Sequence, residues 1–182
     1  MRIVGGEMGG RRFDPPNKMP HTRPTTDIAK EGLFNILQNQ FEFEELKTLD
    51  LFGGTGNISY ELASRGVEDL TIVEKDPLMY EFITKTAASF KLEGLKAFKM
   101  DVFKFIENCD DKYDLIFAGP PYALTTIDDL PVKIFEKQLL KKQGWFILEH
   151  TPRNDYKEFP FYLKERNYGT TVFSIFAENR DQ

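Results

Sequence analysis

The feature that most constrains this chain is a glycine-rich segment, Leu-Asp-Leu-Phe-Gly-Gly-Thr-Gly, at residues 49–56. Residues 48–52 are typical of a buried strand, and the three glycines that follow permit a sharp turn and a close approach to a ligand. We expect a helix from about residue 58, with Asn57 as its N-cap. A strand, a glycine turn and a helix in this order indicate an open α/β sheet, whose ligands bind beyond the carboxyl ends of the strands.

The residues in and beside the glycine turn indicate which class of ligand it binds. No Gly-Lys-Ser/Thr is present, which argues against a phosphate-cradling P-loop, and Ser59 stands where the third glycine of a dinucleotide motif would be. Asp50 would repel a pyrophosphate but suits a cationic amino-acid group. The residues therefore favour S-adenosylmethionine over NAD, with a tight corner that binds nothing as the alternative.

The rest of the chain alternates expected strands and helices. Strands are predicted at 69–74, 95–100, 113–118 and 144–149, and helices at 77–92, 102–108 and 127–140. An earlier helix is capped by Thr25 or Thr26 and runs to about residue 37. Two last strands, at 159–164 and 169–177, are joined tightly and so pair antiparallel. The pattern predicts a mostly parallel seven-stranded sheet with helices on both faces and an antiparallel C-terminal strand.

Three carboxylates end three successive expected strands: Asp50, Glu74 and Asp101. In a parallel sheet these strand ends share one edge, which is also the edge of the glycine turn. Glu74 follows that turn by about 20 residues, the separation at which an acidic residue meets ribose hydroxyls. Asp101 can accept a hydrogen bond from an adenine amino group. Ordinary strand-end surface residues are the alternative interpretation.

Composition and charge indicate the class of protein and of partner. A chain of 182 residues fits a single domain, and its one cysteine predicts a reduced, cytoplasmic setting without a cysteine-based zinc site. No apolar run is long enough for a membrane span. Residues 1–30 hold six basic and three acidic residues, a net charge of +3, which leaves −8 for the remainder of a chain of total charge −5. This basic segment, with a β-hairpin predicted within residues 1–24, indicates local contact with phosphates, and a solvated arm is the alternative.

Taken together, these residues resemble the bacterial small-subunit ribosomal RNA guanine-N2 methyltransferase family of Rossmann-like, S-adenosylmethionine-dependent enzymes. The resemblance rests on the opening Met-Arg-Ile-Val-Gly-Gly with Gly-Arg-Arg-Phe at 10–13, on Thr-Arg-Pro-Thr-Thr-Asp at 22–27, and on the glycine turn. It covers nearly the whole chain and implies a monomer that acts on ribosomal RNA or an assembling 30S particle, with neither membrane nor DNA as partner and no metal. It assigns the cofactor to Asp50, Phe52, Gly53, Gly54, Thr55, Gly56, Asn57, Glu74, Lys75, Asp76, Asp101 and Val102, and the RNA to Arg2, Arg11, Arg12, Arg23 and Thr25.

The expected catalytic residues follow the fourth strand, in the segment Gly119, Pro120, Pro121 and Tyr122. Enzymes of this class usually carry Asp or Asn before Pro-Pro-aromatic, because a side-chain oxygen there accepts a proton from the base amine while the aromatic ring stacks on the extruded base. Gly119 lacks that side chain. Three interpretations stay open: an active enzyme that uses backbone carbonyls or water, a weakened RNA-binding or ribosome-assembly factor that keeps the cofactor pocket, and a pocket widened for a different acceptor.

Overall fold

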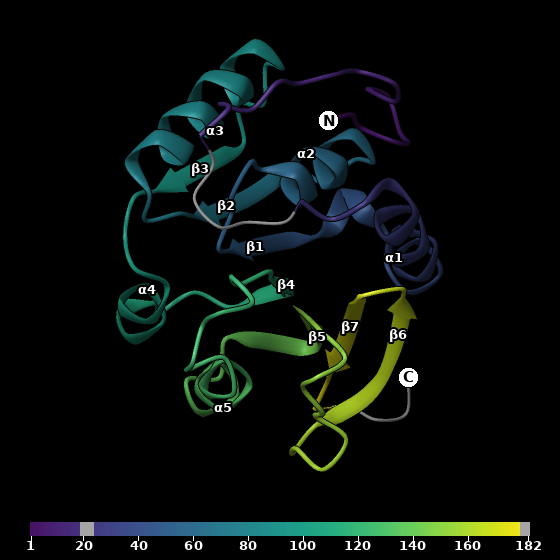
Figure 1. Cartoon of the computed structure of the whole chain (residues 1–182), viewed down its shortest axis with the longest axis vertical. Helices are drawn as coiled ribbons and strands as arrows, with labels where there is room; N and C mark the ends of the chain where they lie inside the picture. The colour runs from purple at the N-terminus through teal and green to yellow at the C-terminus, as the bar shows by residue number, and fades with distance from the viewer. Residues whose placement is uncertain (19–23, 179–182) are drawn as a thin grey trace.

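The computed structural model describes residues 1–18 and 24–178. Its strands form one sheet in the order β3-β2-β1-β4-β5-β7-β6 (Figure 1). Helices lie on both faces of this sheet. In chain order the elements are α1 (Asp27–Gln40), a 3-10 turn (Phe43–Glu45), β1 (Lys47–Leu51), α2 (Asn57–Ser64), β2 (Asp69–Val73), α3 (Pro77–Ser89), β3 (Leu95–Phe98), α4 (Val102–Asn108), β4 (Tyr113–Ala118), α5 (Asp129–Glu136), β5 (Leu140–His150), β6 (Tyr162–Tyr168) and β7 (Thr171–Phe176).

The directions of the strands confirm the predicted fold class. Strands β3, β2, β1, β4 and β5 run parallel, and β7 pairs antiparallel with both β5 and β6. The strand order reverses between β1 and β4, which are hydrogen-bonded neighbours although two strands separate them in sequence. In open α/β sheets a ligand binds at such a reversal, beyond the carboxyl ends of the two strands.

The core consists of two apolar layers, one on each face of the sheet. Because successive strand residues point to opposite faces, Phe117 and Ile147 pack against α1 and α2, whereas Ile116 and Leu148 pack against α4 and α5. Both layers are buried, which fixes the register of the central strands and hence the position of their carboxyl ends. Among the described residues, no helix is long and apolar enough to cross a membrane.

Several predicted boundaries are correct and others are wrong. Helix α4 and strand β4 have the predicted limits. Helix α1 continues to Gln40, past the predicted end near residue 37. Helix α5 is shorter than predicted, because Gln138 adopts a left-handed φ of 52° and β5 already begins at Leu140. Asn57 is not the N-cap of α2 but its first residue; Gly56, with φ of 85°, occupies the cap position.

The predicted N-terminal β-hairpin is present as a hydrogen-bonded loop with little regular strand. Arg2 and Arg12 form an isolated antiparallel bridge, and the Ile3 N–H donates to the Arg11 carbonyl at 2.9 Å. The strand pairing of the predicted hairpin is therefore reduced to this bridge. The hairpin stays attached to the body because Ile3 and Phe13 are buried against Tyr60 and Phe90.

Candidate active site

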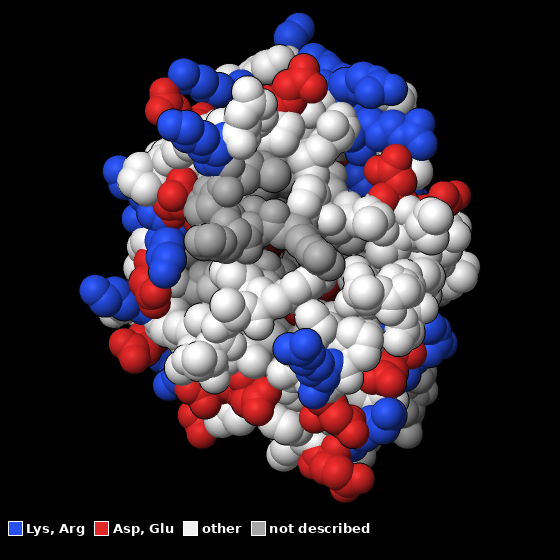
Figure 2. Space-filling view, viewed as in Figure 1, with Lys and Arg blue, Asp and Glu red and all other residues white. Residues whose placement is uncertain are grey.

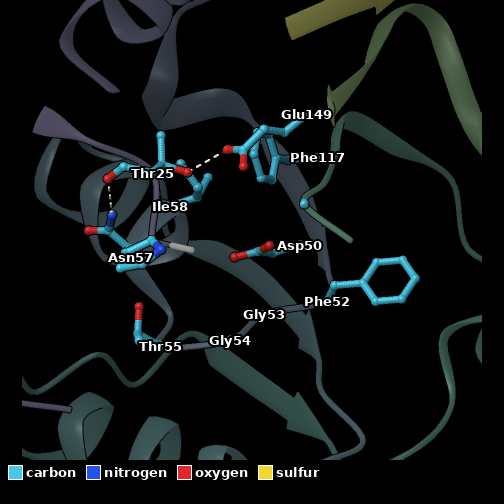
Figure 3. A pocket seen from close by; sticks show the side chains of 12 residues that line it. Thr25, Asp50, Phe52, Gly53, Gly54, Thr55, Asn57, Ile58, Phe117 and Glu149 are labelled. Carbon is cyan, nitrogen blue, oxygen red and sulfur yellow. Dashed lines mark hydrogen bonds between the residues drawn. The ribbon is translucent and has the colours of Figure 1, made fainter. Parts of the chain in front are cut away.

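A pocket lies at the carboxyl ends of β1 and β4, where the strand order reverses (Figure 3). It encloses about 450 Å³, counting the space open to solvent. The residues that line it come from the glycine turn, the ends of β1, β4 and β5, and the segment before α1. They are Pro24, Thr25, Asp50, Phe52, Gly53, Gly54, Thr55, Asn57, Ile58, Phe117, Gly119 and Glu149.

The glycine turn brings the backbone to the edge of this pocket. A Cβ at Gly53 would lie 2.4 Å from the Ile72 side chain, and one at Gly56 would lie 2.4 Å from the Tyr60 ring, so packing excludes side chains at both positions. Gly54 has φ of 57°, and among the described residues the nearest atom to its Cβ position, chain neighbours aside, is the Phe52 carbonyl oxygen at 3.9 Å. A ligand can therefore approach this side of Gly54 closely.

Glu74 and Asp76 hold the second strand end against the glycine turn. The two carboxylate oxygens of Glu74 accept the N–H groups of Gly54 and Asp76, each at 2.8 Å, and burial raises the pKa of Glu74. Because a carboxylate has about four acceptor sites, Glu74 keeps further acceptor capacity. Asp76 caps α3 by accepting from the Met79 N–H at 3.0 Å. Lys75 between them is exposed.

Asp101 caps the following helix. One of its carboxylate oxygens accepts from the N–H groups of Phe103 and Lys104, at 2.9 and 3.2 Å. Val102 is buried at the start of α4. Asp101 is half-buried, and neither residue lines the pocket described above. The cap accounts for an acidic residue at this position independently of any ligand.

Asp50 is a buried acid that points into the pocket (Figure 3). Only 3% of its surface is exposed, and its carboxyl accepts from the Ser59 hydroxyl at 2.7 Å. Burial raises the pKa of Asp50 to about 7, since the hydrogen bonds from Ser59 do not replace the lost hydration. Ser59 therefore serves to hold this carboxyl, at the position where a dinucleotide motif would have its third glycine.

Glu149, at the end of β5, is a second buried acid in the same pocket. It is 4% exposed, and the Thr25 hydroxyl donates to its Oε1 at 2.5 Å (Figure 3). Burial raises the pKa of Glu149 to about 7 as well. Sequence reasoning gave this residue no role. The signal was available, because Glu149 ends a parallel strand just as Asp50 and Glu74 do.

A buried ion pair lies behind the glycine turn. Lys30 and Glu61 are both fully buried, with Nζ 3.1 Å from Oε1. Lys30 also donates to the Asn57 Oδ1 at 2.8 Å and to the Arg2 carbonyl at 2.7 Å. Glu61 accepts from Arg65 and from two backbone N–H groups of the hairpin, each within 2.9 Å. This network positions Asn57 in the pocket and attaches the N-terminal segment to α2.

The Gly-Pro-Pro-Tyr segment continues directly from β4. The Gly119 N–H donates to the Leu51 carbonyl at 3.3 Å, which ties this segment to the end of β1. The Leu124 N–H donates to the Pro121 carbonyl at 2.9 Å and closes a turn. Gly119 lines the pocket, while Pro120 is buried and Tyr122 half-buried outside the lining. The structure thus brings the first of the four predicted catalytic residues to the glycine turn.

Two of the predicted RNA-contacting arginines, Arg2 and Arg11, contact other side chains of the protein although both are exposed. Arg2 pairs with Asp27 at 2.8 Å, and Arg11 stacks 4.3 Å from the centre of the Phe90 ring. Arg12 is exposed, and Arg23 lies outside the described residues. Figure 2 shows Lys and Arg gathered at the upper right of this face, where the N-terminal segment lies, with Asp and Glu among them and both signs of charge at the lower end.

The family model described as Conserved hypothetical protein 95 matches residues 1–177. The chain belongs to this family. It is 28% identical over 145 residues to the Ribosomal RNA small subunit methyltransferase D of Escherichia coli (strain K12), a match that covers 80% of this chain and 69% of that relative. This member of the Conserved hypothetical protein 95 family thus has relatives named for methylation of ribosomal RNA.

Two solved structures show the same fold. A hypothetical protein of Thermus thermophilus is 24% identical with a TM-score of 0.85, over 97% of this chain and 99% of that chain. A Thermus thermophilus 16S rRNA N2 G1207 methyltransferase, solved in complex with AdoMet and guanosine, is 20% identical with a TM-score of 0.68, over 85% of this chain and 44% of that chain. Both likenesses show that this family member shares the Rossmann-like fold of these structures.

In this family member, the pocket unites only part of the predicted site. Its lining combines six residues that were predicted to bind the cofactor with Gly119 and Thr25. Thr25 was expected to contact RNA, yet its hydroxyl is bound to Glu149 inside the pocket. The residues predicted for the cofactor or for catalysis that lie outside the lining are Gly56, Glu74, Lys75, Asp76, Asp101, Val102, Pro120, Pro121 and Tyr122.

Proposed function

We propose that the protein transfers a methyl group from S-adenosylmethionine to the exocyclic N2 amine of a guanine in small-subunit ribosomal RNA. The observation that carries the proposal is the pocket itself, in which the glycine turn and Asp50 meet Gly119 at the end of β4. The names of the curated relative and of the guanosine-bound structural neighbour support ribosomal RNA and guanine N2, respectively.

The residues present fit this cofactor. S-adenosylmethionine, when bound, supplies an electrophilic methyl group on a sulfonium centre. Asp50 and the open backbone at Gly54 suit its cationic amino-acid part, and an ammonium group beside Asp50 would lower the pKa of that carboxyl from about 7. The free acceptor capacity of Glu74 suits the two ribose hydroxyls, with Lys75 and Asp76 beside it. Asp101 and Val102 flank the adenine.

The RNA is held by positive charge and its base is read at the pocket. Arg11 and Arg12 on the hairpin, with Arg2 and Arg23, contact phosphates, which provide affinity without sequence information. The target guanine leaves its stack and lies against Tyr122, because chemistry on a base requires its extrusion. Pro120 and Pro121 restrict the backbone between Gly119 and that ring.

A second candidate function follows from Gly119, where other amino methyltransferases carry a side-chain acceptor. Without it the protein could be a weakened enzyme that acts as an RNA-binding or ribosome-assembly factor. Losing one transition-state hydrogen bond costs about 2.7–4 kcal/mol, roughly a hundred- to a thousand-fold in rate. An aspartate can be placed there: Gly119 has no left-handed φ, and its Cβ would meet the Phe117 ring at 3.2 Å, so the ring must shift slightly.

The test compares the wild-type protein with Gly119→Asp on small-subunit particles that lack the modification. Methyl transfer and RNA affinity are measured for both. Transfer by the wild type at a rate within about tenfold of Gly119→Asp supports the enzyme. A gain of roughly a hundred-fold or more for Gly119→Asp, with RNA affinity unchanged, supports the weakened factor instead.

A further inference from the structure

Gly119 directly follows the last residue of β4, next to the strand β5 that carries Glu149. Ala118, which ends β4, is in register with Leu148 of β5, so Gly119 and Glu149 each come one residue after this pair. Neighbouring strands are about 4.8 Å apart, and residues in register project to the same face of the sheet. A carboxylate at position 149 therefore stands one strand away from the side chain that Gly119 lacks.

The space left by Gly119 opens onto the same pocket as the Glu149 carboxyl. A Cβ at Gly119 would point toward the Phe117 ring, whose nearest atom is 3.2 Å away. Phe117, Gly119 and Glu149 all line the pocket. The Asp50 carboxyl also lines this pocket (Figure 3). Glu149 of β5 thus supplies a hydrogen-bond acceptor in this pocket, where Gly119 after β4 has no side chain to do so.

The carboxyl of Glu149 is fixed in place, and no cation among the described residues balances its charge. Thr25 donates one hydrogen bond to Oε1, which leaves further acceptor sites on the two oxygens. No salt bridge engages Glu149 within residues 1–18 and 24–178. A buried acid without a cationic partner is costly for folding, and such groups gather at functional sites.

We propose that Glu149 is a catalytic residue that accepts the proton released by the target amine, in place of the side chain missing at Gly119. This inference rests on the proposed function. As the amine nitrogen forms its bond to the methyl carbon, the sulfur–methyl bond breaks and its electron pair stays on sulfur. The methylated nitrogen then loses one proton to the Glu149 carboxylate, which later releases it to water.

The simpler interpretation is that Glu149 only holds Thr25 and the segment before α1. Glu149→Gln separates the two, because the amide oxygen can still accept the Thr25 hydroxyl but the amide cannot take up a proton. Asp128→Asn is a matched control: Asp128 accepts the Tyr156 hydroxyl at 2.9 Å, outside the pocket. The same chemical change is thus made at a hydroxyl-bonded acid with no place in the reaction.

The experiment measures single-turnover methyl transfer to unmodified small-subunit particles, cofactor affinity by calorimetry and thermal unfolding. We expect Glu149→Gln to lower the transfer rate by roughly 10²- to 10⁴-fold, the usual contribution of a proton-accepting group. We expect its cofactor affinity to stay within about threefold of the wild type, less than the loss of one hydrogen bond would cause. Asp128→Asn should transfer at the wild-type rate. Adding Gly119→Asp to Glu149→Gln should restore most of the rate, because it returns a carboxylate to the adjacent position.

Two results would overturn the inference while the proposed function stands: wild-type and Glu149→Gln proteins that transfer at similar rates, or a loss that Gly119→Asp does not restore. The second would assign Glu149 to holding Thr25. If the wild type binds the cofactor and transfers nothing, the proposed function fails, and this inference fails with it. The wild-type rate therefore distinguishes the two failures.

Discussion

Replacing Lys30 by methionine is expected to destabilise the protein by about 3–5 kcal/mol, the typical loss when one partner of a buried ion pair is removed. The ammonium group of Lys30 makes three short contacts, at 2.7 Å to the Arg2 carbonyl, 2.8 Å to Asn57 Oδ1 and 3.1 Å to Glu61 Oε1. Both charged side chains are fully buried, so water cannot replace the lost partner, but Arg65 still contacts Glu61 at 2.9 Å and the loss should therefore fall near the lower end of this range. At about 2–4 °C per kcal/mol for a chain of this size, the melting temperature should fall by roughly 6–20 °C.

The assay is urea denaturation of Lys30→Met beside a control, Lys85→Met. Lys85 also pairs with a glutamate, Glu81, at 2.8 Å, but both of these side chains are mostly exposed. The control should lose less than about 0.5 kcal/mol, as exposed helix pairs do. A loss below about 1 kcal/mol for Lys30→Met would refute the reasoning, because it would equate the buried pair with an exposed one.

Three further predictions concern the cofactor, the RNA and the pH dependence of folding. Glu74→Ala should weaken S-adenosylmethionine binding by roughly 10- to 100-fold in calorimetry, since hydrogen bonds to a charged acceptor are lost; unchanged affinity would exclude Glu74 from cofactor binding. Arg11→Gln with Arg12→Gln should weaken RNA binding and reduce its salt slope by about 1–2, and an unchanged slope would exclude the hairpin from RNA contact. Burial raises the pKa of Glu149 from 4.5 to about 7, so its contribution to stability is fully present below pH 4.5 and is lost as the pH rises to about 7. Glu149→Gln should therefore be about 3 kcal/mol more stable than the wild type at pH 8 and similar at pH 4 in denaturant titrations; equal stability at pH 8 would mean that this carboxyl is not desolvated.

The sheet and the glycine turn could be predicted because their signals are local. Apolar runs that end in Asp50 and Glu74, and glycines at fixed positions, define strand ends and a turn without knowledge of distant contacts. The limits of α4 and β4 were correct for the same reason. Asn57 was wrongly predicted to be the N-cap of α2, because asparagine favours that position. In the structure Gly56, with its left-handed backbone, is the N-cap.

The parts of the site that were missed depend on contacts between distant segments. Lys30 was counted in a basic segment, yet it is buried against Glu61, which is 31 positions further along the chain. Nothing local in the sequence distinguishes it from a solvated lysine. Glu149 could have been found, because the strand-end rule that selected Asp50 applies to β5 equally. Its bond to Thr25 spans 124 positions and could not have been found in this way.

Methyl transfer by the wild-type protein tests the proposed function most directly. The measurement supplies S-adenosylmethionine with a labelled methyl group and small-subunit particles that lack the modification, and then identifies the labelled nucleoside after digestion of the RNA. We expect the label in N2-methylguanosine, formed by the wild-type protein with Gly119 and Glu149 both in place. Cofactor binding without label in the RNA, or label in a different nucleoside, would contradict the proposed function.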